Sequence, residues 1–443
     1  MKAIVLIPIG LAIGSLLEAA VLRSSSRSIA AALAQPLPVA TSWHGVGLAA
    51  LGALTLGFAI SAIGYVAIAR LLLSVDIPRP RAALGAIAGA SVLGLLGAFL
   101  APAVISSDAY AYAAYGEMAA RGIDAYSHMP LPLGDPVFAA AIWQWGNPPP
   151  VCVYGPLFVE IARVCVALGA RGGIVAQLVI LRALAMLALL ACVPLAYAAF
   201  APLGRRTRMF AAGFIVLNPL TIWSAAEGHN DALALAIVLA GFAGYRRYGA
   251  AVAGTIVALA TTIKAPGALA AIGLLAVQRG KAFTGALLGV TIGLGLTTLW
   301  FLPGIREIVA ASAHGGHYSA SVSLLAIGPA TAVVIVTILA VCGVRALLAG
   351  RADGWILLAI AVWSALPNPQ PWYGLWFLPI AALAPHSRAA TVVLALSFTT
   401  ALRYVPDAYG PLGWGATAGL SAVAFAPLLA LLAPKSAILS HPQ

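Results

Sequence analysis

The sequence predicts an all-α polytopic membrane protein, a single domain over residues 1–443 that crosses the bilayer about 13 to 14 times. Of the 443 residues, 62% are hydrophobic and only 8% are charged, whereas an ordinary soluble domain is about one quarter charged. Apolar runs of roughly 20 residues, long enough for a helix to span about 30 Å of hydrocarbon, recur along the whole chain. We therefore expect the bilayer to surround nearly all of the protein.

The basic residues are spread along the chain and do not form one binding surface. The net charge is +12, but lysines and arginines stand singly or in pairs between apolar runs, as membrane orientation requires. We therefore expect no nucleic acid partner. The four cysteines show no metal-binding spacing. They are interpreted as packing residues, with a disulfide between Cys152 and Cys165 as the alternative.

About fourteen apolar segments are candidate spans. The first is expected to be an uncleaved span, because no small-residue cleavage site follows it. The segments around Lys264 and between 354 and 386 are short, so broken or tilted helices that line a protein cavity are expected there. The segments are residues 3–22, 46–70, 83–104, 174–200, 209–225, 230–245, 250–263, 265–277, 282–302, 321–345, 354–367, 372–386, 389–403 and 412–433.

The distribution of basic residues predicts the orientation. If the N-terminus is cytoplasmic, most of the 24 basic residues fall on the inner side, among them Arg205, Arg246 and Arg351. The polar clusters near residues 108, 230, 316, 370 and 405 then all lie outside. The site is therefore expected to face the periplasm or the exterior of the cytoplasmic membrane. No nucleotide pool exists there, so an activated substrate must arrive on a lipid.

Residues 105–173 form the one long segment outside the membrane, and amphipathic surface helices are expected in it. A helix beginning near residue 108 places Asp108, Tyr112 and Tyr115 on one face, at i, i+4 and i+7. Glu117 and Arg121 then form an i, i+4 pair on another face. From spacing alone, two interpretations of Asp108 stand: a helix N-terminal cap, or a catalytic carboxylate.

Several short motifs follow one another on this scaffold. They are Ser107-Asp108-x-Tyr110-x-Tyr112-x-x-Tyr115-Gly116, Gly122-Ile123-Asp124-Ala125-Tyr126, Tyr154-Gly155-Pro156-Leu157-Phe158, Asn218-Pro219-Leu220, Gly228-His229-Asn230-Asp231-Ala232-Leu233 and Lys264-Ala265-Pro266. Together they resemble the GT-C glycosyltransferases. The resemblance is strongest to the bacterial α-mannosyltransferases that use polyprenol-phosphate-mannose as donor, in particular to α-1,6-mannosyltransferases. Ala125 stands where that family tends to have proline.

The resemblance implies a GT-C fold and a transfer reaction. It assigns the role of general base to Asp108. The donor implied is a polyprenyl phosphate carrying a hexose, with mannose as the leading expectation, and the acceptor is a lipid-linked or glycan hydroxyl. A single carboxylate base without a second close carboxylate favours inversion by direct displacement. Neither a divalent metal nor another cofactor is expected.

Further residues are expected to bind the substrates. Tyr112 and Tyr115 can form a wall for the sugar, or belong to an interfacial aromatic belt. Lys264, beside a helix break, can bind phosphate or extend to the interface. By resemblance His229 donates to phosphate and Asp231 holds it or the acceptor, although Asn230 or Asp231 can instead cap the following helix.

The remaining candidates lie further along the chain. His314, His317 and Tyr318 belong to a glycine-containing loop whose imidazoles can bind phosphate or a divalent ion, although no carboxylate pair accompanies them at ligand spacing. Trp372 and Tyr373 can line the groove of the prenyl chain or anchor the interface. Arg403 can contact substrate or pair with Asp407. Glu117 completes the set of candidate substrate-binding residues.

Two other functions fit parts of the sequence. Broken helices and intramembrane charges also occur in transporters and flippases of lipid-linked sugars. Against a transporter, the sequence shows no internal repeat, and its polar motifs gather on one side of the membrane. A non-catalytic subunit of a polysaccharide assembly machine is the third interpretation.

Overall fold

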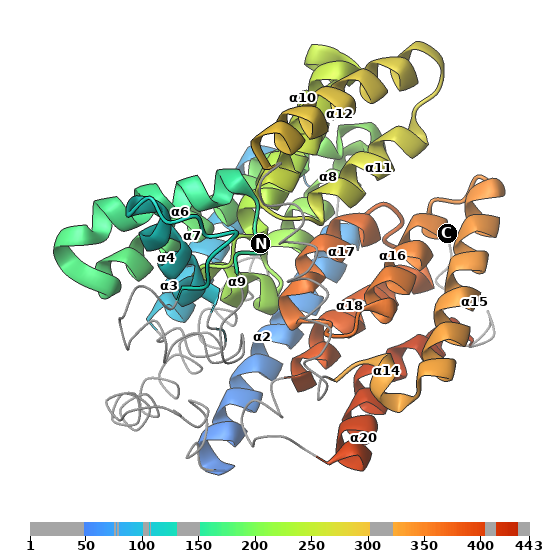
Figure 1. Ribbon diagram of the computed structural model, residues 1–443. Helices are drawn as coiled ribbons and strands as arrows, with labels where there is room; N and C mark the ends of the chain where they lie inside the picture. Colours follow the sequence, from blue (N-terminus) through green and yellow to red (C-terminus); the bar gives the residue numbers. More distant parts are fainter. Residues whose placement is uncertain are drawn as a thin grey trace. The chain divides into compact units, whose positions relative to one another are not determined.

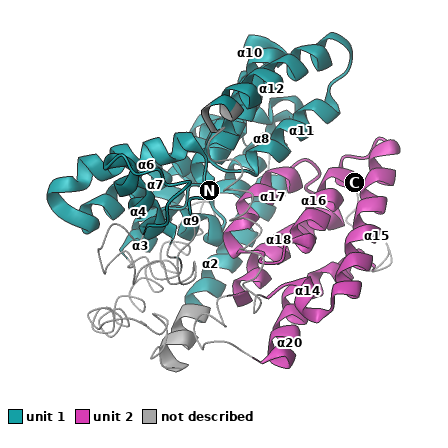
Figure 2. Cartoon of the chain, viewed as in Figure 1, with its two compact units in different colours: residues 1–317 teal, residues 318–443 magenta. Residues whose placement is uncertain are grey.

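The computed structural model describes residues 48–74, 77, 79–100, 106, 108–130, 151–301, 322–403 and 413–432. Within these ranges every element is a helix (Figure 1). The chain divides into two compact units, Met1–His317 and Tyr318–Gln443, which are coloured separately in Figure 2. The prediction of an all-α polytopic membrane protein is confirmed. The prediction that residues 1–443 act as one domain stays a prediction.

Unit 1 contains the longest helices of the described chain. It comprises α2 (Leu48–Ser74), α3 (Pro80–Phe99), α4 (Asp108–Ala120), α6 (Pro156–Gly169), η3 (Ala170–Gly172), α7 (Gly173–Ala199), η4 (Ala201–Leu203), α8 (Gly204–Val216), α9 (Pro219–Ala226), α10 (Asp231–Leu259), η5 (Ala260–Thr262), α11 (Gly267–Val277) and α12 (Gly280–Phe301). Helix α7 lies among α3, α4, α6, α8, α9 and α10 and contacts each of them, so it forms the centre of the unit (Figure 1).

Unit 2 is built from shorter helices. It comprises α14 (Leu324–Ile327), α15 (Pro329–Leu348), α16 (Asp353–Ala365), η7 (Pro371–Tyr373), α17 (Gly374–Ala381), α18 (Arg388–Thr399), η8 (Thr400–Arg403), α20 (Trp414–Phe425) and η9 (Ala426–Leu431). Helix α16 packs against α15, α17 and α18. Its side chain Trp363 is fully buried and stacks on Phe377 of α17, with ring centroids 4.6 Å apart.

The described residues contain five helical stretches that are long and apolar enough to cross a membrane, or six if a bent pair counts as one span. The five are Leu56–Ser74, Pro80–Phe99, Pro156–Ala199, Pro329–Leu348 and Trp414–Leu431. Several of the other expected segments form shorter apolar helices, such as Gly267–Val277 and Asp353–Ala365. The expected span 3–22 lies outside the described residues. Within the described residues, breaks in the apolar runs leave several helices shorter than a membrane span.

The bent pair consists of Ala201–Val216 and Pro219–Ala226, which meet at an angle of 51°. Pro219 stands at the first position of α9, where the N–H that proline lacks would have no partner within the helix. The Asn218 side chain caps α9 by accepting a hydrogen bond from the Leu220 N–H at 3.0 Å. The loop that carries His229 follows directly after α9.

Helix α10 consists of two arms that meet at Gly249, where the backbone is not helical (φ 84°, ψ 175°). The arms agree with the expected separate segments 230–245 and 250–263. The first arm begins at Asp231, and the second leads through η5 to Lys264. The arginines Arg246 and Arg247 lie at the turn between the arms. The two arms pack against each other and form a hairpin. Asp231 and Lys264, which are distant in sequence, therefore lie together at one end of this hairpin, and the arginines lie at the other end.

The segment 105–173, expected to be a loop outside the membrane, contains two described α-helices, α4 and α6, which pack against each other. Helix α6 is part of the apolar stretch Pro156–Ala199, which is long enough to cross a membrane. Helix α4 is buried on nearly all sides, including Asp108, Tyr112, Tyr115 and Met118. It begins at Asp108, as expected, and Gly122 follows its end with a φ of 72°. Because α4 also packs on α7, its first residue lies inside unit 1 and not on a free surface.

Candidate active site

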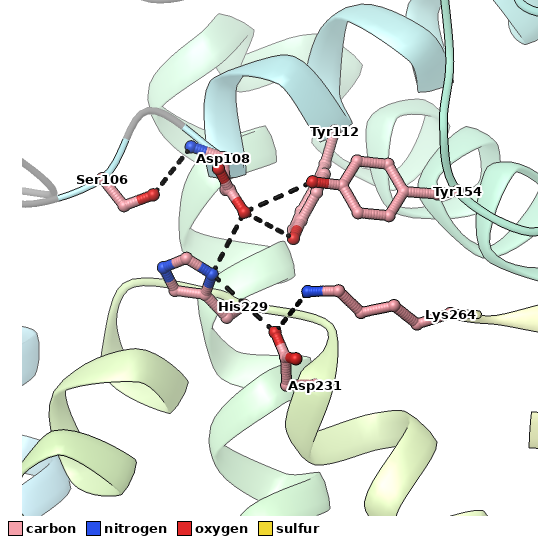
Figure 3. A network of polar contacts seen from close by, with 7 residues as sticks. All are labelled: Ser106, Asp108, Tyr112, Tyr154, His229, Asp231 and Lys264. Atoms are coloured by element: carbon pink, nitrogen blue, oxygen red, sulfur yellow. Dashed lines mark hydrogen bonds and ion pairs between the residues drawn. The ribbon is translucent and has the colours of Figure 1, made fainter. Parts of the chain in front are cut away.

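Asp108 is the first residue of α4 and is 6% exposed. Its Oδ2 atom accepts hydrogen bonds from the hydroxyls of Tyr112 at 3.2 Å and Tyr154 at 3.3 Å (Figure 3). The Asp108 N–H donates to Oγ of Ser106 at 3.2 Å. Ser106 therefore satisfies a backbone N–H at the start of α4, while the Asp108 carboxylate is directed at side chains.

An aromatic wall stands on one side of this carboxylate. The Tyr112 ring packs edge-on against Tyr154 at 4.8 Å and against Phe158 at 4.6 Å, measured between ring centroids. Both tyrosine hydroxyls point to Asp108 (Figure 3). Tyr112 thus has an inward, buried position, which differs from the lipid interface expected of an aromatic belt.

His229 reaches the carboxylate from the loop between α9 and α10. Its Nδ1 atom lies 3.2 Å from Oδ2 of Asp108 and 4.0 Å from Oδ2 of Asp231, with the side chain 1% exposed. The preceding residue, Gly228, has a φ of 93°, a conformation that L side chains rarely adopt. This turn lets the His229 N–H donate to the Ser224 carbonyl at 3.0 Å and brings the imidazole between the two carboxylates.

Lys264 completes the cluster from the other end of the α10 hairpin. Its Nζ atom donates to Oδ2 of Asp231 at 2.7 Å, and the ammonium lies 5.8 Å from the centroid of the Tyr154 ring. Asp231 is fully buried, and the Lys264 side chain is 11% exposed. A buried carboxylate requires such a partner, because an isolated charge is costly away from water. The Asp231–Lys264 pair is thus an ion pair at the start of α10.

The surrounding charges determine the ionisation of Asp108. Burial raises its pKa, but the nearby charges of His229 and Lys264, with hydrogen bonds from His229 and Tyr112, outweigh burial and lower the pKa to about 2. The tyrosines respond in the opposite direction: burial, and then the charge of Asp108, raise the pKa of both Tyr112 and Tyr154. The site therefore holds a carboxylate that is ionised and phenols that are neutral.

Asn230 lies between His229 and Asp231 and is 1% exposed. Its side chain makes no capping hydrogen bond to α10, so the capping role considered for it is not seen. Both the amide oxygen and the amide nitrogen are buried without a hydrogen-bond partner. An unsatisfied buried amide is destabilising by about 1 to 3 kcal/mol and is a group that a ligand could satisfy.

Two expected site residues on α4 lie outside this cluster of contacts. The Tyr115 hydroxyl donates to the Val151 carbonyl at 3.5 Å. Glu117 pairs with Arg121 at 3.0 Å, as the i, i+4 spacing predicted. Both residues therefore hold the loop and α4 in place, and their contact with substrate stays a prediction.

The remaining candidates are placed by unit 2 or lie outside the described residues. Trp372 is buried in η7 and packs edge-on against Tyr373 at 6.2 Å. The Arg403 Nε donates to Oδ1 of Asn368 at 3.0 Å; Asp407, its expected partner, lies outside the described residues. His314, His317 and Tyr318 also lie outside them. The expected absence of a metal stays a prediction as well.

Sequence reasoning missed Tyr154 as a site residue. Tyr154 lies in the non-helical segment before α6, where no periodicity indicates the direction of a side chain. The next residue, Gly155, was the signal in the sequence that could have indicated the position of Tyr154. A Cβ on Gly155 would lie 2.1 Å from the Thr262 carbonyl oxygen, so only glycine allows this segment to lie against η5 and bring Tyr154 beside Lys264.

Comparison with known proteins identifies the family. Residues 6–280 match the model of the alpha-(1->6)-mannopyranosyltransferase family, N-terminal domain, and this match covers more than half of the 443 residues. No curated protein and no solved structure matches the chain. The matched range includes all seven residues drawn in Figure 3. The chain, in which a carboxylate, an imidazole and an ammonium group form this buried cluster, therefore belongs to the alpha-(1->6)-mannopyranosyltransferase family of membrane glycosyltransferases.

Proposed function

We propose that the protein transfers mannose from a polyprenyl phosphate to a hydroxyl of a lipid-linked or glycan acceptor at the outer face of the cytoplasmic membrane. The observation that carries this proposal is the position of Asp108, a buried and ionised carboxylate beside His229 and the Asp231–Lys264 pair. A base and positive charge thus lie together, as a displacement at a sugar phosphate requires. The family match supports mannose as the sugar.

In the proposed reaction, Asp108 accepts the proton of the acceptor hydroxyl while the hydroxyl oxygen attacks C1 of the mannose. The bond between C1 and the phosphate oxygen breaks, and the electron pair leaves with the polyprenyl phosphate. Lys264 and His229 stabilise the negative charge on this leaving group. Attack opposite the departing phosphate inverts the configuration at C1, which turns a β-linked donor into an α-linked product. No step requires a metal ion.

The hydrogen bonds of Asp108 orient the proposed base, although they also lower its pKa. Oδ2 is occupied by Tyr112, Tyr154 and His229, which fix the direction of the carboxylate. A fixed base reaches the acceptor hydroxyl without the entropic cost of ordering a mobile side chain. Asp231 is a second carboxylate close to Asp108, contrary to the expectation of a single one, since both lie within 4.0 Å of the His229 Nδ1 atom. It has a different role in the proposal, because its contact with Lys264 aims the ammonium.

The test measures transfer of radiolabelled mannose from polyprenyl-phosphate-mannose by the purified protein in proteoliposomes. Asp108→Asn should lower turnover at least about a hundredfold, because the amide cannot accept the proton. Donor binding should stay close to that of the wild type, because the phosphate contacts remain. The matched control is Asp353→Asn, which also changes the first residue of a helix but lies in an exposed pair with Arg351.

Three results would contradict the proposal. Turnover by Asp108→Asn at the wild-type rate would remove Asp108 as the base. Mannose transfer from a nucleotide sugar, and none from the lipid donor, would remove the polyprenyl phosphate. Movement of the lipid donor across the bilayer without transfer would instead identify a flippase.

A further inference from the structure

Arg182 is a buried arginine in the middle of α7, 8% exposed, with no role in the chemistry described above. A charged side chain within a membrane helix is costly and is usually retained for a function. Its guanidinium lies over the ring of Phe99, 4.4 Å from the centroid, and close enough to Glu227, itself 3% exposed, to interact electrostatically. Arg182 is therefore the centre of a second polar cluster in unit 1.

The hydrogen bonds of Arg182 join two helix ends. Nη2 donates to the Phe99 carbonyl at 2.9 Å and Nε donates to the Ala226 carbonyl at 2.5 Å. Phe99 is the last residue of α3 and Ala226 is the last residue of α9. Carbonyl groups at helix ends lack partners within the helix, and the helix dipole makes these ends favourable for a cation. One guanidinium thus caps both helices.

Each of the two capped helices precedes a residue of the proposed active site along the chain, one Asp108 and the other His229. Helix α3 is followed along the chain by α4, which begins at Asp108, and α9 is followed by the turn that carries His229. A Cβ built on Gly228 would lie 3.3 Å from Cγ of Arg182 and 3.4 Å from Cβ of Ala109. The residue before His229 is therefore packed between Arg182 and the residue after Asp108.

We propose that Arg182 is a positioning residue that holds the Glu227–Gly228–His229 turn against α4, and thereby keeps His229 in contact with Asp108. Arginine suits this role because its planar fork donates to two carbonyls at fixed angles, whereas a lysine ammonium acts as a point charge on a flexible stem. The catalytic consequence rests on the proposed function; the effect on the turn does not.

The first test uses amide hydrogen exchange and needs no substrate. In the wild type the N–H groups of Glu227, Gly228 and His229 donate to the carbonyls of α9. Arg182→Lys should raise their exchange at least about tenfold, because the end of α9 loses its cap. Arg208→Lys is the matched control. Arg208 also donates to a backbone carbonyl and lies over an aromatic ring, and both of these groups belong to Tyr197, away from the site. Unchanged exchange in Arg182→Lys would overturn the proposal.

The second test is a double-mutant cycle with His229→Gln. Arg182→Lys alone should lower kcat at least about tenfold while changing the KM for the donor less than about threefold. In the His229→Gln background the same change should cost less than about twofold, because the residue through which Arg182 acts is gone. Losses that multiply would show that Arg182 acts independently of His229 and would overturn the proposal.

A second variant covers the case in which Arg182→Lys does not fold. Arg182→Gln keeps an amide donor but removes the charge and the planar fork, and it should show the same loss of kcat and the same dependence on His229. A full loss of kcat that persists in the His229→Gln background would overturn the proposal. A wild-type protein that transfers no mannose would instead contradict the proposed function, while the exchange test would still decide the role of Arg182.

Discussion

The charge on Asp108 depends on its neighbours at the scale of single residues. Burial favours the neutral acid, while His229 and Lys264 favour the carboxylate and prevail, so the pKa falls to about 2. Because this pKa lies below the ordinary value, the carboxylate is ionised in the free enzyme at neutral pH. Protonation of Asp108 therefore does not limit wild-type activity near neutral pH.

Lys264→Met should move the acidic limb of the pH profile upward. Removing the ammonium takes away a charge that favours the carboxylate, and it leaves Asp231 without its 2.7 Å partner. Both effects raise the pKa of Asp108. The profile of kcat/KM reports an essential base in the free enzyme, so its acidic limb should shift to higher pH.

The control for this prediction is Lys281→Met, which removes an exposed lysine from the start of α12. Its profile should match that of the wild type. The lower overall kcat/KM expected for Lys264→Met does not enter the comparison, which concerns only the pH at half-maximal activity. An acidic limb at the wild-type position in Lys264→Met would show that Lys264 does not govern the ionisation of Asp108.

The residues of the site were predictable where they belong to helical patterns or recognisable motifs. Asp108 and Tyr112 follow from i, i+4 spacing, and the structure joins their side chains. That His229 lies closer to Asp108 than to Asp231 was not predictable, since it depends on the turn at Gly228. In the sequence, Arg182 is visible only as a charge inside an apolar segment. The carbonyls it binds belong to distant helices, and no local sequence pattern indicates them.

At the scale of elements, the site depends on one close approach between two segments without regular helical structure. The Gly155 N–H donates to the Ile263 carbonyl at 3.1 Å, and this contact joins the segment before α6 to the segment after η5. The first segment carries Tyr154 and the second carries Lys264. The alignment of these two segments therefore determines whether the side chains of Tyr154 and Lys264 both lie near Asp108.

Gly155→Ala should separate these segments. The added Cβ would lie 2.1 Å from the Thr262 carbonyl oxygen, and a backbone atom cannot move aside as a flexible side chain can. Overpacking of this kind costs about 1 to 3 kcal/mol, and a displaced ammonium should lower mannose transfer at least about tenfold. Thermal unfolding in detergent and the transfer assay measure the two effects.

Gly89→Ala provides the matched control, because Gly89 lies in α3 and a Cβ added there would have no neighbouring atom within 4 Å. An alanine in a helix is, if anything, more stable than a glycine, so both stability and transfer should be preserved. If Gly155→Ala were as stable and as active as Gly89→Ala, the close approach at Gly155 would have no role in building the site.

At the scale of the whole molecule, composition predicted the membrane class because it averages over every residue. The number of spanning helices was less predictable, since hydropathy counts apolar runs while breaks at Asn218 and Gly249 determine helix lengths. The family match, residues 6–280, lies within unit 1. It covers the cluster around Asp108 but not Trp372, Tyr373 and Arg403 in unit 2, and the roles of all these residues stay predictions.

The arrangement of charge in unit 1 leads to a prediction of topology. Asp231 and Lys264 lie at one end of the α10 hairpin and Arg246 and Arg247 at the other, about 22 Å away along the first arm at 1.5 Å per residue. Basic residues favour the cytoplasmic side. The end with Asp108 and His229 should therefore face outward, and the arginines inward.

Cysteine labelling of intact cells with a membrane-impermeant maleimide tests this orientation. The background is Cys342→Ser, because Cys342 is exposed while Cys152, Cys165 and Cys192 are buried. In that background His128→Cys, at an exposed position after α4, should be labelled in intact cells. Arg206→Cys and Arg247→Cys, also at exposed positions, should be labelled only after the membrane is permeabilised.

The opposite pattern would place Asp108 on the cytoplasmic side, where nucleotide sugars are present, and the argument for a lipid-linked donor from orientation would fail. Labelling of all three positions in intact cells would show leaky membranes, which a cytoplasmic marker enzyme in the medium identifies.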